Sequence, residues 1–146
     1  MPYIKVYIHF VWSTKKRFPF FTSQELREQV WMHIHDYASS KGIVIDQING
    51  YAEHCHCLVS LRGEQTLGEI MKLIKGESSH WINKGNLTEE KFAWQDEYFA
   101  MAVSPSMVEK VRAYIRSQES HHQIKPFQQE YDDLIQKIGV QTLKND

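Results

Sequence analysis

The sequence has few cysteines, no long apolar run and almost no net charge. The only cysteines among the 146 residues are Cys55 and Cys57. Residues two apart in a strand are separated by about 6.6 Å, near the upper limit for the Cα separation of a disulfide. There is no run of about 18 apolar residues and no basic segment that leads into an apolar one. We therefore expect a reduced, cytoplasmic protein with no membrane span and no secretion signal.

The net charge of −1 and the pI of about 6.7 count modestly against a nucleic-acid-binding protein. The basic residues nevertheless cluster apart from the acidic ones. The basic clusters are Lys15-Lys16-Arg17, Lys72 with Lys75, and Arg112 with Arg116. Each cluster can be either a solvated surface or part of a positive surface that binds DNA, and the sequence leaves both interpretations open.

The chain length indicates one domain that spans residues 1–146. Apolar and β-branched segments predict strands at 3–13, 42–48, 51–61 and 98–103, with a hairpin turn at Asn49-Gly50. Capping boxes at Thr22–Glu25 and Thr66–Glu69 predict the starts of two helices, and Ser104-Pro105 predicts the start of a third, which Pro126 ends or breaks. Residues 127–138 are expected to form a last short helix. The order β-α-β-β-α-β predicts an α+β fold: a ferredoxin-like antiparallel sheet with helices on one face.

A pair of histidines, His54 and His56, lies within the third predicted strand. Because alternate residues of a strand face the same side, both imidazoles can converge on one metal ion. Cys55 and Cys57 then face the other side, which excludes a zinc site made from all four residues. The pair can equally be two half-exposed strand residues without a function.

Tyr114 and Gln118 are four residues apart on the predicted third helix, so their side chains are neighbours on one helix face. His121 and His122 continue that face. Tyr114 can be a core aromatic beside the Val111–Ile115 stripe, or it can be a nucleophile. A phenol with a pKa near 10 attacks a phosphodiester poorly without help, and a divalent ion that grips the phosphate supplies that help.

The H-C-H run in a strand and the later Tyr-Ile-Arg-Ser-Gln helix resemble the HUH superfamily of single-strand DNA endonucleases. The sequence is most similar to the small single-tyrosine transposases of bacterial insertion sequences, of TnpA and REP-associated type. The segments Phe10–Lys15, Phe92–Gln95 and Phe127–Gly139 extend the resemblance from about Tyr3 to Val140. Cys55 departs from the pattern, because larger aliphatic residues are commoner at the middle position.

The resemblance implies a transposase with an additional C-terminal catalytic helix. Tyr114 would form a 5′-phosphotyrosine link and free a 3′-hydroxyl. His54, His56 and Gln118 would hold Mg²⁺ or Mn²⁺. The substrate would be single-stranded DNA with hairpins at the element ends, and the protein would be a homodimer. The resemblance further implies that Tyr114 of one chain completes the site whose histidines belong to its partner.

The candidate DNA contacts are Lys15, Lys16, Arg17, Lys72, Lys75 and Arg116. Two related alternatives stay open: a domesticated hairpin-DNA-binding protein that does not cut, and a nicking enzyme of the replication-initiator type. A histidine-triad nucleotide hydrolase would need a third histidine where Leu58 stands. Cleavage of a labelled hairpin oligonucleotide distinguishes these functions.

Overall fold

The computed structural model describes residues 2–121, 129, 132–133 and 136. The elements, in order, are β1 (Val6–Ser13), η1 (Lys15–Arg17), α1 (Gln24–Ser40), β2 (Val44–Tyr51), β3 (His54–Leu61), α2 (Leu67–Lys84), β4 (Phe99–Val103), η2 (Pro105–Met107), α3 (Val108–Arg116) and α4 (Gln118–His121). The predicted order β-α-β-β-α-β followed by helices is confirmed. Most of the predicted helix at 127–138 lies outside the described residues. None of the helices in the described part of the chain is both long enough and apolar enough to cross a membrane.

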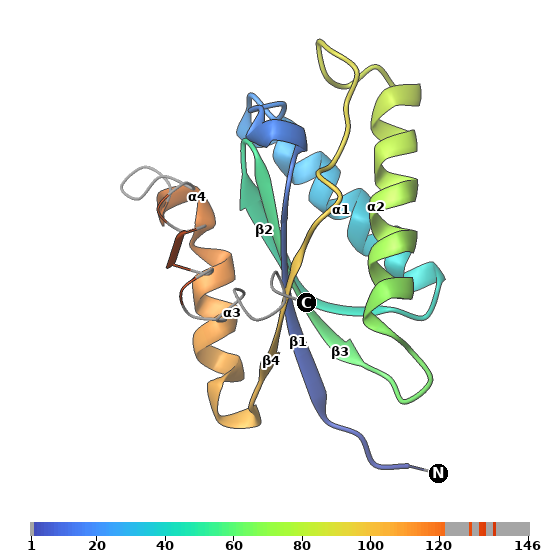
Figure 1. The fold of residues 1–146 in the computed structure, drawn as a ribbon, viewed down its shortest axis with the longest axis vertical. Helices are drawn as coiled ribbons and strands as arrows, with labels where there is room; N and C mark the ends of the chain where they lie inside the picture. Colours follow the sequence, from blue (N-terminus) through green and yellow to red (C-terminus); the bar gives the residue numbers. More distant parts are fainter. Residues whose placement is uncertain (1, 122–128, 130–131, 134–135, 137–146) are drawn as a thin grey trace.

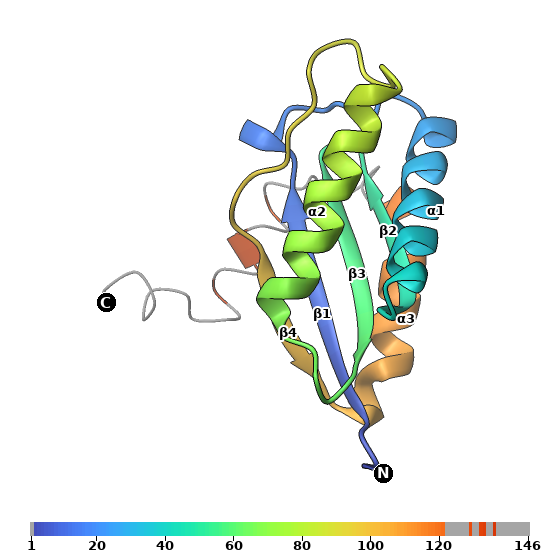
Figure 2. The same cartoon turned by 90° about the vertical axis from the view of Figure 1, so that its right-hand side faces the viewer.

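The four strands form one antiparallel sheet in the order β2-β3-β1-β4. Helices α1 and α2 cover one face of this sheet, and α3 and α4 lie on the other (Figures 1 and 2). Strand alternation divides the core accordingly. In β1, Phe10 and Trp12 pack toward α1 and α2, whereas Val11 belongs to the opposite face. The predicted ferredoxin-like fold with an extra C-terminal helix is confirmed.

The helix ends largely follow their sequence signals. Thr66 caps α2 by accepting a hydrogen bond of 3.2 Å from the backbone N–H three residues on, as predicted. In α1 the capping residue is Ser23, whose hydroxyl accepts at 3.1 Å, so the prediction of Thr22 is wrong by one residue. Gly42 follows α1 with a φ of +75°, the left-handed conformation that glycine adopts most easily after a helix.

The predicted hairpin turn at Asn49–Gly50 is wrong. Strand β2 continues through these residues to Tyr51, and the turn falls at Ala52–Glu53. Gly50 is required by a close approach of strands: a Cβ there would lie 2.1 Å from the carbonyl oxygen of His54 and 2.9 Å from the Trp31 ring. The dipeptide therefore reflects crowding between β2 and its neighbours, which an isolated sequence motif does not distinguish from a turn.

The C-terminal helical region is divided into shorter pieces than the sequence predicts. Pro105 begins the 3-10 turn η2, and α3 starts only at Val108. The helix then ends at Arg116, with Ser117 as its C-cap, and α4 follows at once from Gln118. The third helix therefore starts three residues later than predicted and is interrupted at Ser117, so Tyr114 and Gln118 lie on two consecutive helices. Residues 122–126 lie outside the described residues.

Candidate active site

The two strand histidines lie side by side under α3 and α4. The ring centroids of His54 and His56 are 5.1 Å apart, and both side chains are completely buried. Cys55 and Cys57 point into the core on the α1–α2 side, where burial raises the pKa of both thiols and keeps them protonated. The predicted sharing of one face by the histidines is confirmed, and the interpretation of half-exposed strand residues is wrong.

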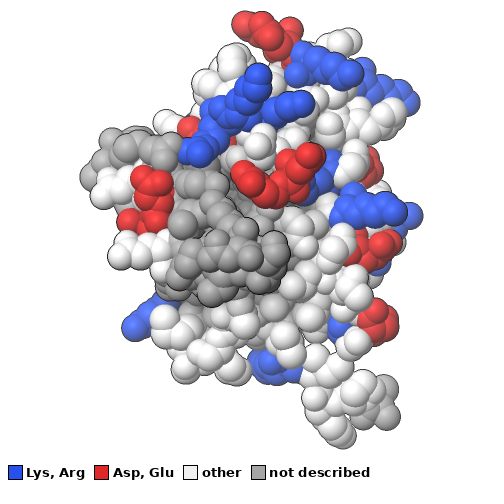
Figure 3. Space-filling model, viewed as in Figure 1, with Lys and Arg blue, Asp and Glu red and all other residues white. Residues whose placement is uncertain are grey.

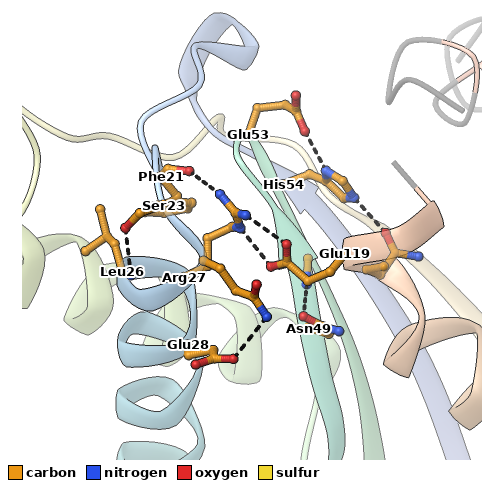
Figure 4. Close-up of polar contacts among 12 residues, drawn as sticks. Phe21, Ser23, Leu26, Arg27, Glu28, Asn49, Glu53, His54 and Glu119 are labelled. Atoms are coloured by element: carbon orange, nitrogen blue, oxygen red, sulfur yellow. Dashed lines mark hydrogen bonds and ion pairs between the residues drawn. The ribbon is translucent and has the colours of Figure 1, made fainter. Parts of the chain in front are cut away.

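His54 is held between a carboxylate and a carboxamide (Figure 4). Its Nδ1 lies 2.8 Å from Oε1 of Glu53, and its Nε2 lies 3.1 Å from Oε1 of Gln118. The carboxylate can only accept, so Nδ1 carries a proton. The Gln118 amide group donates to the carbonyl oxygen of Tyr114 at 3.4 Å, which turns Oε1 toward His54. When the imidazole is neutral, its Nε2 is an acceptor. Nε2 of His54 and Oε1 of Gln118 then face each other as two acceptors inside the protein.

The separation of these two atoms is close to that of two adjacent ligands of one divalent cation. Two adjacent ligands of an octahedral Mg²⁺, each about 2.1 Å from the ion, are separated by about 3.0 Å. The distance between Nε2 of His54 and Oε1 of Gln118 is 3.1 Å. The described part of the chain contains no group of three or more His, Cys, Asp or Glu side chains that could hold a metal ion. A metal site here thus depends on the Gln118 amide oxygen as well as on the histidines.

His56 has a histidine of the neighbouring strand as its partner. Its Nδ1 lies 2.9 Å from Nε2 of His9, which β1 places beside β3 and which is only 6% exposed. The ring of Tyr114 stands edge-on to both, with centroids 5.4 Å from His56 and 6.3 Å from His9. His9 and Glu53 are absent from the predicted site residues. The place of His9 in the site is predictable from the sequence, since strand alternation from Tyr7 to Val11 puts it on the same face of the sheet as His54 and His56.

Tyr114 and Gln118 reach the histidines because α3 packs on the sheet. Ile115 and Val108 form a small core with Leu58 of β3, and Tyr114 is partly buried against that core. Gln118 is completely buried. The predicted interpretation of Tyr114 as a core aromatic is thus half correct, because one part of the ring packs while the ring also contacts His56.

Polar contacts with β2 fix the direction of α3. Arg112 makes a two-pronged ion pair with Asp46 at 2.8 Å and 2.7 Å. This hydrogen-bonded guanidinium lowers the pKa of Asp46 and keeps the carboxylate charged. The side-chain amide of Asn49 donates to the carbonyl oxygen of Arg116 at 3.1 Å, next to the end of the helix. These contacts bracket Tyr114 along α3.

The candidate residues therefore meet within a single chain. His54 and His56 come from β3, and Tyr114 and Gln118 come from α3 and α4 of the same polypeptide. The structure describes one chain, so the expected homodimer and the expected sharing of each site between two chains stay predictions. His122, whose role the sequence leaves open, lies outside the described residues.

The predicted basic cluster at 15–17 forms an exposed turn next to the site strand. Lys15 and Lys16 are exposed, and Lys16 and Arg17 both have positive φ, near +55°. Thr14 ties this turn to the β2–β3 turn, because its N–H donates to the carbonyl oxygen of Glu53 at 2.8 Å. In the view of Figure 3, Lys and Arg side chains gather toward the upper part of the molecule, with acidic side chains among them.

The remaining predicted DNA contacts differ in their surroundings. Lys72 and Arg116 are exposed. The Lys75 ammonium is half-buried and donates to the carbonyl oxygens of Gln95 and Asp96 at 2.6 Å and 2.9 Å, and burial lowers its pKa. Lys75 therefore already stabilises the turn before β4, and its predicted DNA contact stays a prediction.

Comparison with known proteins places these features in a family context. The family model for "Transposase IS200 like" matches residues 3–118. The ISDra2 transposase TnpA of Deinococcus radiodurans is 24% identical over 115 residues, which cover 75% of this chain and 81% of that protein. The matched segment of the family model contains all four candidate residues.

Two solved structures share the fold. A candidate transposase from Deinococcus radiodurans R1 gives a TM-score of 0.65 at 19% identity, over 80% of this chain and 93% of that one. A REP-associated tyrosine transposase bound to a REP hairpin gives a TM-score of 0.60 at 22% identity, over 84% of this chain and 72% of that one. At these identities, the likeness concerns the arrangement of strands and helices.

Proposed function

Because the chain belongs to the IS200-like transposase family, we propose that it cuts and rejoins single-stranded DNA at hairpin-containing element ends. Tyr114 acts as the nucleophile and forms a 5′-phosphotyrosine link. The observation that supports this role most directly is its position: the Tyr114 ring contacts His56, while Gln118, on the next helix, contacts His54. A tyrosine beside a buried set of neutral ligands is arranged for attack on a phosphate that a metal held by those ligands would position.

The proposed metal ligands are Nε2 of His54, His56 and Oε1 of Gln118. All three are neutral, so a bound Mg²⁺ or Mn²⁺ would keep its charge for the scissile phosphate and position it. Glu53 accepts the Nδ1–H of His54 and leaves Nε2 as the ligand atom. If His56 likewise binds through Nε2, its Nδ1–H donates to His9. Each histidine then has an outer partner that fixes its orientation, as is usual for metal-ligating histidines.

The reaction exchanges one phosphoester for another. The phenolic oxygen of Tyr114 forms a bond to phosphorus as the bond from phosphorus to the 3′-oxygen breaks. The 3′-oxygen takes up a proton and leaves as a free hydroxyl, and the phenol loses its proton. Because the number of phosphoester bonds is unchanged, a 3′-hydroxyl can later attack the tyrosyl phosphate and rejoin the strand.

We propose that the basic turn at Lys15–Arg17 holds the DNA backbone next to the site. Phe18 follows this turn and is 47% exposed, so an unpaired base can stack on its ring. The solved REP-associated transposase is bound to a hairpin, and we propose a hairpin-containing strand as the ligand of this protein too. A protein that only binds hairpins would not need Tyr114 beside two histidines.

The test is cleavage of a labelled single-stranded hairpin oligonucleotide with Mg²⁺ or Mn²⁺. We expect strand cleavage that stops with a chelator and is lost in His54→Ala, His56→Ala and Tyr114→Phe variants. Tyr37→Phe is the matched control, because Tyr37 lies on α1 away from the site, and it should cleave normally. Metal-independent cleavage, or equal cleavage of plain duplex DNA, would refute the proposal.

We also propose that the protein acts as a homodimer, and a complementation experiment decides how its sites are assembled. A His54→Ala/His56→Ala protein and a Tyr114→Phe protein, each inactive alone, are mixed and allowed to exchange subunits. Sites shared between chains would regenerate one intact site per heterodimer and restore cleavage. Sites within one chain, as the single chain is arranged, would leave the mixture inactive.

A further inference from the structure

A buried arginine connects α1 to helix α4, which carries Gln118. Arg27 is only 7% exposed. Its Nε and Nη2 each donate to a carboxylate oxygen of Glu119 at 2.8 Å, and its Nη1 donates to the carbonyl oxygen of Phe21 at 2.8 Å (Figure 4). The guanidinium also lies 4.5 Å from the centroid of the Tyr51 ring. Neither Arg27 nor Glu119 has a part in the chemistry proposed above.

The two-pronged pair fixes Glu119 both in position and in direction. A guanidinium that meets a carboxylate through two parallel hydrogen bonds allows little rotation of either group. Arg27 is itself held by Phe21 and Tyr51, so the anchor belongs to the rigid part of the fold. Burial of the Arg27 charge without a partner is unfavourable. Arg27 therefore favours the arrangement in which the Glu119 carboxylate is docked beside it.

Helix α4 is fixed to the rest of the fold through its first turn. The described part of α4, Gln118–His121, includes the Glu119 carboxylate that Arg27 holds, and most of the stability of a helix in a folded protein comes from such tertiary contacts. The break at Ser117 also separates it from α3. Helix α3 has its own anchors on β2, at Asp46 and Asn49. Apart from the 3.4 Å hydrogen bond from the Gln118 amide to the Tyr114 carbonyl oxygen, the proposed nucleophile and the proposed amide ligand are therefore held by different contacts.

We propose that Arg27 is a positioning residue that, through Glu119, holds the Gln118 carboxamide against His54. This role rests on the proposed function insofar as Gln118 is a metal ligand. The docking of α4 by the ion pair does not depend on whether Gln118 binds a metal. Loss of the pair should weaken metal retention and leave Tyr114 in place. The apparent metal affinity should fall, while the cleavage rate at saturating metal should change little.

The variants are Glu119→Gln, which keeps the size of the side chain and removes its charge, and Arg27→Lys, which keeps the charge and removes the two-pronged geometry. The matched control is Glu109→Gln. Glu109 also pairs with an arginine, Arg112, but its side chain is 77% exposed and it lies on α3. Glu119→Gln and Glu109→Gln thus each remove a carboxylate from an ion pair, but only Glu119→Gln removes one that lies on α4.

The first measurement is hydrogen exchange of the full-length protein without metal, read by mass spectrometry. In Glu119→Gln and Arg27→Lys, we expect faster exchange in peptides that cover 117–121 and unchanged exchange in peptides that cover β3 and α3. Glu109→Gln should match the wild type in 117–121. Unchanged exchange in both Glu119→Gln and Arg27→Lys would overturn the proposal, and so would a uniform increase throughout the chain, which indicates a general loss of stability.

The second measurement is Mn²⁺ titration, by electron paramagnetic resonance and by cleavage. Loss of a group hydrogen-bonded to a metal ligand typically lowers metal affinity by about 10–100-fold. The Arg27–Glu119 pair acts one step further out, and we expect a shift of about 10-fold in both Glu119→Gln and Arg27→Lys. The rate at saturating Mn²⁺ should stay within a few fold of the wild type. An unchanged titration would contradict the positioning role. If the wild type does not bind Mn²⁺, the proposed metal site fails, whereas hydrogen exchange still decides how α4 is docked.

Discussion

Replacing Gly50 with alanine should destabilise the fold and disturb the site together. The added methyl group would lie 2.1 Å from the carbonyl oxygen of His54 and 3.0 Å from Cα of Cys55. Both are backbone atoms, so no side-chain rotation relieves the contact. The hairpin of β2 and β3 must open by roughly 1 Å to restore an ordinary separation, and that movement shifts the strand that carries His54.

The expected loss of stability is near the upper end for inserting a methyl group into a packed interior, about 3 kcal/mol. For a domain of about 150 residues, this corresponds to a fall in Tm of about 6–12 °C. Urea denaturation followed by circular dichroism measures the change in midpoint. Because a displacement of about 1 Å at a catalytic group can cost about 100-fold in rate, DNA cleavage should fall as well, even at temperatures where the variant is folded.

Gly76→Ala is the control with the same chemical change. Gly76 lies inside α2, where an added Cβ has no atom within 4 Å. Alanine in the interior of a helix is favoured over glycine by about 1 kcal/mol, so this variant should be more stable than the wild type and equally active. A Gly50→Ala protein with wild-type stability would show that the close approach of β2 and β3 does not constrain the hairpin.

Two further results are expected. Because Arg112 lowers the pKa of Asp46, the stabilisation from this pair is present above the unfolded pKa of about 4 and is lost as the pH falls through the folded pKa. Asp46→Asn should therefore lower the Tm at pH 7 and have little effect on it at about pH 2. An equal loss at both pH values would contradict the ion-pair origin. Replacing Lys15 and Lys16 with alanine should weaken single-stranded DNA binding and reduce the slope of log K against log[salt] by about 0.7 per lost phosphate contact, whereas Lys41→Ala, at the far end of α1, should leave the slope unchanged.

Much of the fold follows from local sequence signals. Strand alternation places His54 and His56 on one face and Cys55 on the other, and the structure confirms this division. The Thr66 capping box and Gly42 mark helix ends correctly. The resemblance to insertion-sequence transposases is confirmed by the family match to residues 3–118. These features depend on neighbours in the sequence or on a periodic pattern, so a single sequence contains them.

The remaining features depend on contacts between distant residues. Gly50 resembles a turn glycine, and only its approach to the His54 carbonyl oxygen explains it. His9 joins the site because β1 lies beside β3 in the sheet. Glu119 meets Arg27 across 92 positions of sequence. No local pattern contains such pairings, which is why the break at Ser117 and the separate docking of α4 escape prediction.

The most direct measurement is the identity of the residue that becomes covalently linked to DNA. The protein is incubated with a single-stranded hairpin oligonucleotide and Mn²⁺, denatured and digested with protease, and the nucleotide-bearing peptide is sequenced by mass spectrometry. We expect one adduct, a 5′-phosphate ester on Tyr114, and no adduct in Tyr114→Phe. An adduct on another tyrosine such as Tyr131, or strand cleavage without any covalent intermediate, would contradict tyrosine attack at the site formed by β3, α3 and α4.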